Sequence, residues 1–358
     1  MYNYFSNETL LSVPSKRAAY SDRTSYLMAE MSRLAYFKFE GGNTVDEIIS
    51  QVRELLPESQ KLAALEALIK SHVKQSSKAD SEAILTQILE QSGFTFVRAF
   101  DDSGTDTQAF LCINSSQGIA ILAFRGTEPS LKDIKSDINA RLETVQHNEK
   151  PVQIHSGYLA GFNSIRDEIK EALDGEEVKG LQLFITGHSL GGALAITAVK
   201  FLASDITGAC YTFGSPPVGT KTFDHDIRTP IYRVVNHVDI VPRLPNPVLV
   251  LGIRFIGMLA GLILPLAGAI SMIKETALYS KLEMILIDAQ KYRQSGYGSY
   301  LVGEGSSVRL RYSVSIIDKI HWWLKQFANV FQGEFKLLSD HSIDMYSKKL
   351  AIWAESRK

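Results

Sequence analysis

The fold is decided by residues 181–203, which read LQLFITGHSLGGALAITAVKFLA. Residues 181–186 are mostly apolar and rich in β-branched types, which is typical of a short buried strand. From Leu190 onward apolar residues recur at helical spacing, for example at Leu194 and Val199. The chain must therefore turn abruptly from strand to helix, and Ser189 stands at the apex of that turn.

Two glycines flank this serine in the pattern Gly-x-Ser-x-Gly. Gly187 and Gly191 lie where a Cβ would collide with neighbouring backbone in so sharp a turn. The pattern is that of a nucleophile elbow, which lifts a serine hydroxyl clear of a sheet and beside a helix N-terminus. A glycine-rich turn with an incidental serine is the alternative, but the strand before and the helix after favour the elbow. Ser189 is therefore the candidate nucleophile.

Composition excludes several classes of protein. The 358 residues carry a formal net charge of -1, with 45% hydrophobic and 22% charged residues, which is typical of a globular protein with a sizeable core. A nearly neutral chain gives no electrostatic reason to expect a nucleic-acid partner. The two cysteines, Cys112 and Cys210, lie in strand-like runs, so we expect buried thiols and no disulfide framework.

No sequence motif indicates a metal, a nucleotide or a secretory signal. The chain holds no zinc-type histidine spacing, Walker loop, EF-hand or dinucleotide fingerprint, so we expect no cofactor and no metal. Residues 1–17 lack a basic start followed by an apolar core. We therefore expect a cytoplasmic or membrane-associated location, or export by a route that needs no signal peptide. The sequence does not define the oligomeric state.

Hydrophobic periodicity divides the chain into three parts. Residues 1–42 include an amphipathic helical stretch and are expected to pack on the core. Residues 43–93 carry helical stripes that favour an insertion of two or three helices. Residues 94–358 alternate short strands with helices, which predicts a mostly parallel sheet covered by helices on both faces. The antiparallel pair expected at 108–124 should lie at the sheet edge. The strands are expected at 94–100, 108–114, 118–124, 152–155, 181–186, 210–213 and 231–236.

The acid partner of Ser189 should lie downstream of it. A serine hydroxyl needs a histidine to take its proton and an acid to orient that histidine. On a sheet of this kind the three follow the order Ser, then Asp or Glu, then His. Asp239 comes just beyond a strand, where such sites form. Asp224 and Asp226 are rivals, but they lie in a polar turn typical of solvated side chains.

Two histidines follow Asp239 and compete for the role of base. His341 lies in the loop before a C-terminal helix, where a base is expected, whereas His321 lies in the amphipathic aromatic stretch KIHWWLK, typical of a packed surface. His237 precedes Asp239 and is expected to be structural. His188, beside the serine, should point elsewhere as a packing or hydrogen-bonding residue.

An oxyanion hole needs two preorganised backbone N–H donors. Leu190, directly after the nucleophile at the helix start, is one candidate. The loop that begins FRGTEPS is the other, because Gly126 permits a close approach and Thr127 offers both an N–H and a hydroxyl. An ordinary turn after a strand is an equal alternative for that loop taken alone.

Five motifs stand in the order AFRGTE, IHSGYLAGF, ITGHSLGGALA, YTFGSPPVG and NHVDIVPRLP. Together they resemble the class 3 lipase family, the fungal-lipase-like α/β-hydrolases, and DHSIDMY resembles the C-terminal histidine segment of that family. The match covers residues 94–245 closely and 296–358 loosely. The resemblance implies an α/β-hydrolase fold, Ser189 as nucleophile with Asp239 and His341 as its partners, and Thr127 and Leu190 as the oxyanion hole. It also implies hydrolysis of carboxyl esters in acylglycerols or phospholipids without a cofactor.

Three functions are compatible with these residues. The leading prediction is a triacylglycerol lipase or a phospholipase A-type enzyme that works through an acyl-enzyme. A lipid acyltransferase would differ only in the acceptor of the acyl group. A catalytically silent membrane-binding protein on the same fold is the third alternative, since unrelated functions share folds.

An apolar insertion at about 246–295 lies between Asp239 and His341. Residues 255–272 carry no charge over 18 positions, the lower limit for a membrane span. A buried or lid-like hairpin, a hairpin dipping into one leaflet and a true span all remain open. Under the first two interpretations we expect residues 247–273 to contact acyl chains or a membrane or lipid-aggregate surface.

Overall fold

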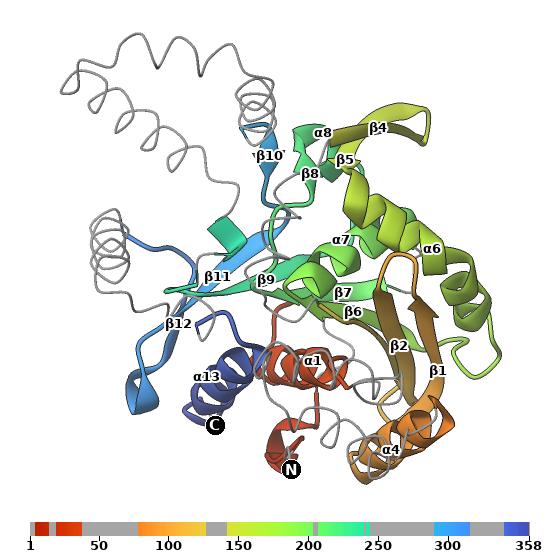
Figure 1. Cartoon of the computed structure of the whole chain (residues 1–358). Helices are drawn as coiled ribbons and strands as arrows, with labels where there is room; N and C mark the ends of the chain where they lie inside the picture. The colour runs from red at the N-terminus through yellow and green to blue at the C-terminus, as the bar shows by residue number, and fades with distance from the viewer. Residues whose placement is uncertain are drawn as a thin grey trace, which may run out of the picture.

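The structure is a computed structural model, and it describes residues 4–13, 19–37, 78–126, 142–202, 207–239, 241–243, 290–315 and 340–357. Its centre is an eight-stranded sheet in the order β1-β2-β3-β6-β7-β9-β11-β12 (Figure 1). The strands are β1 (Thr95–Asp102), β2 (Thr107–Asn114), β3 (Ile119–Phe124), β6 (Gln182–His188), β7 (Thr207–Phe213), β9 (Ile231–Asn236), β11 (Tyr297–Val302) and β12 (Arg309–Arg311). The five strands from β3 to β11 pair in parallel, and antiparallel strands flank them on both sides.

The prediction of a mostly parallel sheet is confirmed, but the predicted edge is wrong. The pair β2–β3 does not form the edge, because β1 pairs with β2 on its outer side. Burial explains this order, since every residue of β2 is buried whereas β1 is half-exposed along most of its length. A strand buried on both faces needs a neighbour on each side, and the amphipathic strand takes the edge.

Helices cover both faces of this sheet, as predicted. The helices α1 (Asp22–Leu34), α4 (Lys78–Gln91) and α13 (Ile343–Glu355) pack on one face, and α6 (Ser156–Leu173) and α7 (Leu190–Leu202) pack on the other (Figure 1). The alternation of strand side chains produces the two cores. In β3, Ile119 and Ile121 belong to the core under α1, whereas Ala120 and Leu122 belong to the core under α7.

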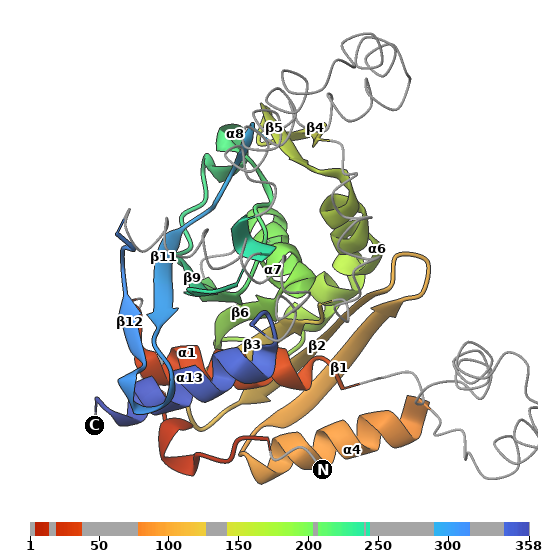
Figure 2. The same ribbon diagram turned by 60° about the vertical axis from the view of Figure 1, so that its left-hand side comes forward.

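Helices α1 and α13, which are far apart in the sequence, lie against each other. Figure 2 shows α13 alongside α1 beneath the parallel strands. Trp353 Nε1 in α13 donates to Asp22 Oδ1 at the start of α1 over 2.8 Å. At the other end of the pair, Arg33 Nε lies 2.7 Å from Asp344 Oδ1, and the buried Glu30 accepts a hydrogen bond from Ser347. Residues remote in sequence thus form one layer.

A second, small sheet was not predicted. It pairs β10 (Tyr292–Arg293), β8 (Gly219–Thr220), β5 (Lys150–His155) and β4 (Leu142–His147), with α8 (Lys221–Asp224) beside it. Strands of two residues leave no periodic signal in a sequence. The hairpin β4–β5 turns at Asn148 and Glu149, whose φ angles of 50° and 63° are those of a type I′ turn. The described residues also form three 3-10 turns: η1 (Glu8–Leu10), η2 (Val241–Arg243) and η3 (Gly305–Ser307).

Two predicted insertions fall wholly or partly outside the described residues. Of the insertion expected at 43–93, the described part is helix α4, whose Leu85 and Leu89 are buried in the core under α1. Most of the apolar insertion at about 246–295, including residues 247–273, lies outside the described residues. No helix among the described residues has the length and apolar character that crossing a membrane requires.

Candidate active site

The predicted elbow is present between β6 and α7. The strand ends at His188, the helix begins at Leu190, and Ser189 between them has a φ of 56°. That left-handed conformation is rare for a residue with a side chain and marks a strained turn. A Cβ on Gly187 would fall on the backbone of Gly191, and a Cβ on Gly191 would fall on the backbone of Phe124 and Arg125. The two glycines are therefore required by close backbone contact.

The structure brings three predicted site residues together. His341 Nε2 lies 2.7 Å from Ser189 Oγ, and His341 Nδ1 lies 2.8 Å from Asp239 Oδ2. Ser189 follows β6 and Asp239 follows β9, so both lie past the carboxyl ends of parallel strands. His341 stands in the loop before α13. The His341 side chain is 2% exposed and that of Asp239 is fully buried, so the hydrogen bond between them is shielded from water.

Asp239 accepts hydrogen bonds from other groups besides His341. The backbone N–H of Val241 donates to Asp239 Oδ1 over 2.9 Å, and the Tyr346 hydroxyl donates to Asp239 Oδ2 over 2.6 Å. Burial and the neighbouring carboxylate raise the pKa of Tyr346 well above its ordinary value, so it stays a donor. Sequence reasoning missed Tyr346, although it stands in the quoted segment DHSIDMY.

The loop that carries His341 is anchored by Asn236, the last residue of β9. The fully buried Asn236 side chain donates through Nδ2 to the Asp340 carbonyl over 2.8 Å. Its Oδ1 accepts from Lys349 Nζ over 2.9 Å, and its backbone N–H donates to the Tyr346 hydroxyl over 2.9 Å. Burial lowers the pKa of Lys349. The end of β9 thus ties the loop of His341 to helix α13.

One of the two predicted oxyanion donors lies in the described part of the chain. Leu190 is the first residue of α7, so its backbone N–H belongs to the first turn, where no intrahelical acceptor exists. Thr127 lies outside the described residues. Gly126, which precedes it, is buried, and a Cβ there would collide with the Tyr36 hydroxyl and the His188 carbonyl. The elbow therefore packs directly against the start of the Thr127 loop.

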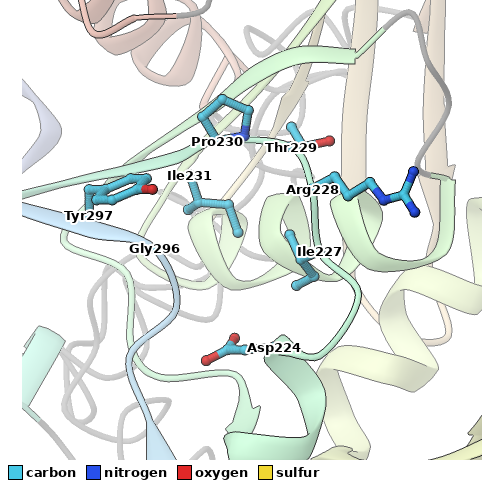
Figure 3. Close-up of a pocket in the computed structure, with 8 residues that line it drawn as sticks. All are labelled: Asp224, Ile227, Arg228, Thr229, Pro230, Ile231, Gly296 and Tyr297. Atoms are coloured by element: carbon cyan, nitrogen blue, oxygen red, sulfur yellow. The ribbon is translucent and has the colours of Figure 1, made fainter.

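The rival residues lie elsewhere or have other partners. Asp226 pairs with Lys150 across 3.1 Å. Asp224 lines a separate pocket of about 310 Å³ between β9 and β11, drawn in Figure 3. Neither ring nitrogen of His341 bonds to them, since one faces Ser189 and the other Asp239. His321 lies outside the described residues.

The other two histidines near Ser189 and Asp239 in the sequence, His188 and His237, make hydrogen bonds around the site. The backbone N–H of His237 donates to the Leu301 carbonyl, and its carbonyl accepts from Arg243. His188 is buried and hydrogen-bonded, as expected. Among the described residues, no three metal-binding side chains gather in one place.

Comparison with known proteins shows a similarity to lipases in the central part of the chain. Residues 121–249 match the model of the class 3 lipases. The matched segment contains the elbow, Ser189 and Asp239. This central segment of the chain is similar to the class 3 lipases.

Two relatives of this chain are named as mono- and diacylglycerol lipases. A secreted mono- and diacylglycerol lipase of Fusarium solani is 36% identical over 98 residues, which cover 26% of this chain and 29% of that protein. The secreted mono- and diacylglycerol lipase LIP4 of Malassezia restricta is 30% identical over 145 residues, covering 37% of this chain and 48% of that protein. The chain thus spans less than half the length of these relatives.

A solved lipase from Rhizopus microsporus var. chinensis aligns over 87% of this chain and 85% of its own, with 17% identity and a TM-score of 0.48. The strand order, the elbow and the match to the class 3 lipases together identify an α/β-hydrolase fold. The expected fold class is therefore confirmed.

The expected cytoplasmic location is wrong. The relatives from Fusarium solani and Malassezia restricta are both named as secreted enzymes. The expectation rested on the composition of residues 1–17 alone, and the composition of one short stretch does not decide where a protein works.

Proposed function

We propose that this chain is a serine carboxyl-ester hydrolase that acts on lipid esters. The observation that carries the proposal is the continuous hydrogen-bond path from Ser189 Oγ through the His341 ring to Asp239. A hydroxyl, an imidazole and a buried carboxylate in this order form the unit that activates a serine in acyl transfer. The match of residues 121–249 to the class 3 lipases, together with relatives named as lipases, supports lipid esters as the substrate class.

Each member of the path has a role in the proposed reaction. His341 Nε2 takes the proton of Ser189 as the oxygen attacks the ester carbonyl carbon. The bond between Ser189 Oγ and that carbon forms, and the carbonyl oxygen becomes an oxyanion, which the N–H groups of Leu190 and Thr127 would stabilise. His341 then gives the proton to the alcohol oxygen as the ester C–O bond breaks, leaving an acyl-serine.

Water completes the proposed cycle. His341 Nε2 takes a proton from a water molecule, whose oxygen attacks the acyl-serine carbonyl carbon. The bond to Ser189 Oγ breaks, the proton returns to that oxygen, and the fatty acid leaves. Asp239 accepts the His341 Nδ1 hydrogen throughout and stabilises the imidazolium formed after each proton transfer. If an alcohol replaced water, the same steps would transfer the acyl chain, as in a lipid acyltransferase.

We also propose that residues 247–273 contact acyl chains or a lipid surface. The proposal rests on their composition and on their position in the chain between Asp239 and His341. Deleting the segment should lower hydrolysis of emulsified long-chain esters more than hydrolysis of soluble short-chain esters. Equal retention of both activities would contradict this part of the proposal.

The main test combines labelling with product analysis. The parent protein should react with a fluorophosphonate probe and release fatty acid from acylglycerol or phospholipid emulsions, whereas Ser189→Ala should do neither while keeping its circular dichroism spectrum. Mass spectrometry of products, with and without added alcohol, would separate hydrolysis from acyl transfer and identify the head group. Failure of the folded parent to react with the probe or cleave any lipid ester would favour a catalytically silent protein.

A further inference from the structure

His188 is a buried side chain next to Ser189 that takes no part in the proposed chemistry. It ends β6, and it is 3% exposed. Its Nε2 lies 2.6 Å from the backbone carbonyl oxygen of His341, and its Nδ1 lies 2.7 Å from the hydroxyl of Tyr36, just past the end of α1. The centroids of the His188 and His341 rings are 4.6 Å apart. His188 therefore touches the base without bonding to either of its ring nitrogens.

The chemistry of these partners fixes the direction of both hydrogen bonds. A carbonyl oxygen only accepts, so His188 Nε2 must carry the hydrogen. Burial and the adjacent His341 hold the pKa of His188 well below its ordinary value, so the ring is neutral and has one hydrogen. Nδ1 is then an acceptor, and the Tyr36 hydroxyl donates to it. The bonds run from Tyr36 to His188 and from His188 to the His341 carbonyl.

The His341 loop is held at two consecutive carbonyls. Asn236 Nδ2 donates to the Asp340 carbonyl, and His188 Nε2 donates to the His341 carbonyl. Both anchoring side chains are buried, and they come from the ends of β6 and β9, which flank β7 in the sheet. These two anchors fix the backbone from which the His341 ring reaches Ser189.

Tyr36 also contacts the other side of the elbow. A Cβ on Gly126 would collide with the Tyr36 hydroxyl, so this oxygen lies directly against the start of the Thr127 loop. One hydroxyl therefore stands between the loop after β3 and the residue before Ser189. Helix α1 fixes the tyrosine, since Ser32 Oγ of the same helix lies 2.9 Å from Thr186 Oγ1 in β6.

We propose that Tyr36 and His188 are positioning residues, which set the distance between Ser189 and His341 by locking His188 in the form that donates to the His341 carbonyl. The inference rests on the proposed function, because it concerns the alignment of the proposed base. Without the Tyr36 donor, His188 loses one of the two partners that favour its hydrogen on Nε2. In the other tautomer a lone pair would face the carbonyl oxygen, and repulsion would move the loop and lengthen the contact between His341 Nε2 and Ser189 Oγ.

Nitrogen NMR of histidine-labelled protein tests the lock without any assay of activity. In the parent, His188 should show a protonated Nε2 and an unprotonated Nδ1 that accepts a hydrogen bond. Tyr36→Phe should shift the Nδ1 signal and increase the share of the other tautomer. A parent spectrum with the hydrogen on Nδ1 would overturn the proposal.

Kinetics with a soluble ester, p-nitrophenyl butyrate, test the consequence. Tyr36→Phe should lower kcat about tenfold, the effect of losing one net hydrogen bond, and leave KM within about twofold. Tyr211→Phe is the matched control, since it removes another buried hydroxyl, one that accepts from the Ser21 N–H at 3.4 Å, at the opposite end of α1 from Tyr36. Its kcat should equal that of the parent. Equal kcat in Tyr36→Phe and the parent, or equal losses in both variants, would contradict positioning.

A second pair of variants tests the donor itself. His188→Gln keeps an N–H group near the place of Nε2, whereas His188→Asn is too short to reach the His341 carbonyl. The glutamine variant should retain at least about tenfold more kcat than the asparagine variant. Equal rates in the two folded variants would overturn the role of His188. An unreactive parent protein would instead refute the proposed function, and the NMR result would still stand on its own.

Discussion

Tyr346→Phe tests how the buried end of the site is held together. The substitution removes one oxygen and keeps the ring, which is fully buried on α13. That oxygen donates to Asp239 Oδ2 over 2.6 Å and accepts from the Asn236 N–H over 2.9 Å. The variant therefore loses two buried hydrogen bonds, one of them to a carboxylate.

The expected loss in the free energy of unfolding follows from these two hydrogen bonds. A hydrogen bond to a charged group contributes about 1.5–3 kcal/mol, and an unpaired buried N–H costs about 1–3 kcal/mol. Removing the desolvated hydroxyl itself offsets part of the sum, so we expect a loss of about 3 kcal/mol in the free energy of unfolding. Tyr211→Phe, whose hydroxyl accepts a long 3.4 Å bond from the Ser21 N–H and interacts with the Thr24 side chain, should cost about 1 kcal/mol, because neither partner is charged.

Urea denaturation followed by circular dichroism measures both variants. The midpoint of Tyr346→Phe should fall clearly below that of Tyr211→Phe while the slopes stay equal, because neither substitution changes the surface exposed on unfolding. Ester hydrolysis should also fall, since Asp239 loses one of the donors that fix its side chain. If Tyr346→Phe unfolded within about 0.5 kcal/mol of the parent, the hydrogen bonds to Asp239 and Asn236 would not contribute as reasoned.

Three further outcomes follow from glycine contacts, a buried imidazole and buried thiols. Gly187→Ala should cost about 4 kcal/mol or more and lower the soluble yield, because its Cβ would meet backbone atoms. Gly118→Ala, at a φ of +69° with nothing within 4 Å, should cost only about 1 kcal/mol in thermal unfolding. The unfolding free energy should fall as the pH drops below the ordinary histidine pKa of 6.5. The reason is that unfolded His188 binds a proton there, whereas folded His188, with a pKa well below that value, does not. In urea titrations, His188→Gln should reduce this dependence of the unfolding free energy on pH. Burial raises the pKa of the thiols of Cys112 and Cys210, so a thiol reagent should label them only in denaturant.

The sequence predicted the parts of the site that follow from local rules. The elbow needs glycines at fixed offsets around Ser189, and an acid after a strand together with a histidine before the last helix suggested Asp239 and His341. Tyr36 and Tyr346 escaped notice because nothing local distinguishes them from core tyrosines. Each acts on a residue more than 100 positions away, so only the packing of α1 and α13 gives them a role.

The fold shows the same division between local and distant information. The long apolar strands and amphipathic helices were predicted from their periodicity. The small sheet escaped because β8 and β10 have two residues each. The outer place of β1 depends on the burial of β2, which is a property of the folded sheet and not of either segment alone.

The adjacency of α1 and α13 has a consequence for the order of assembly. Trp353 and Asp22 meet across 331 positions of chain, and Glu30 meets Ser347 across 317. Contacts between such distant positions form late in folding, because the closure of a long loop must precede them. During synthesis Ser189 and its elbow are made well before His341, so the contact between their side chains can form only after α13 has docked beside α1.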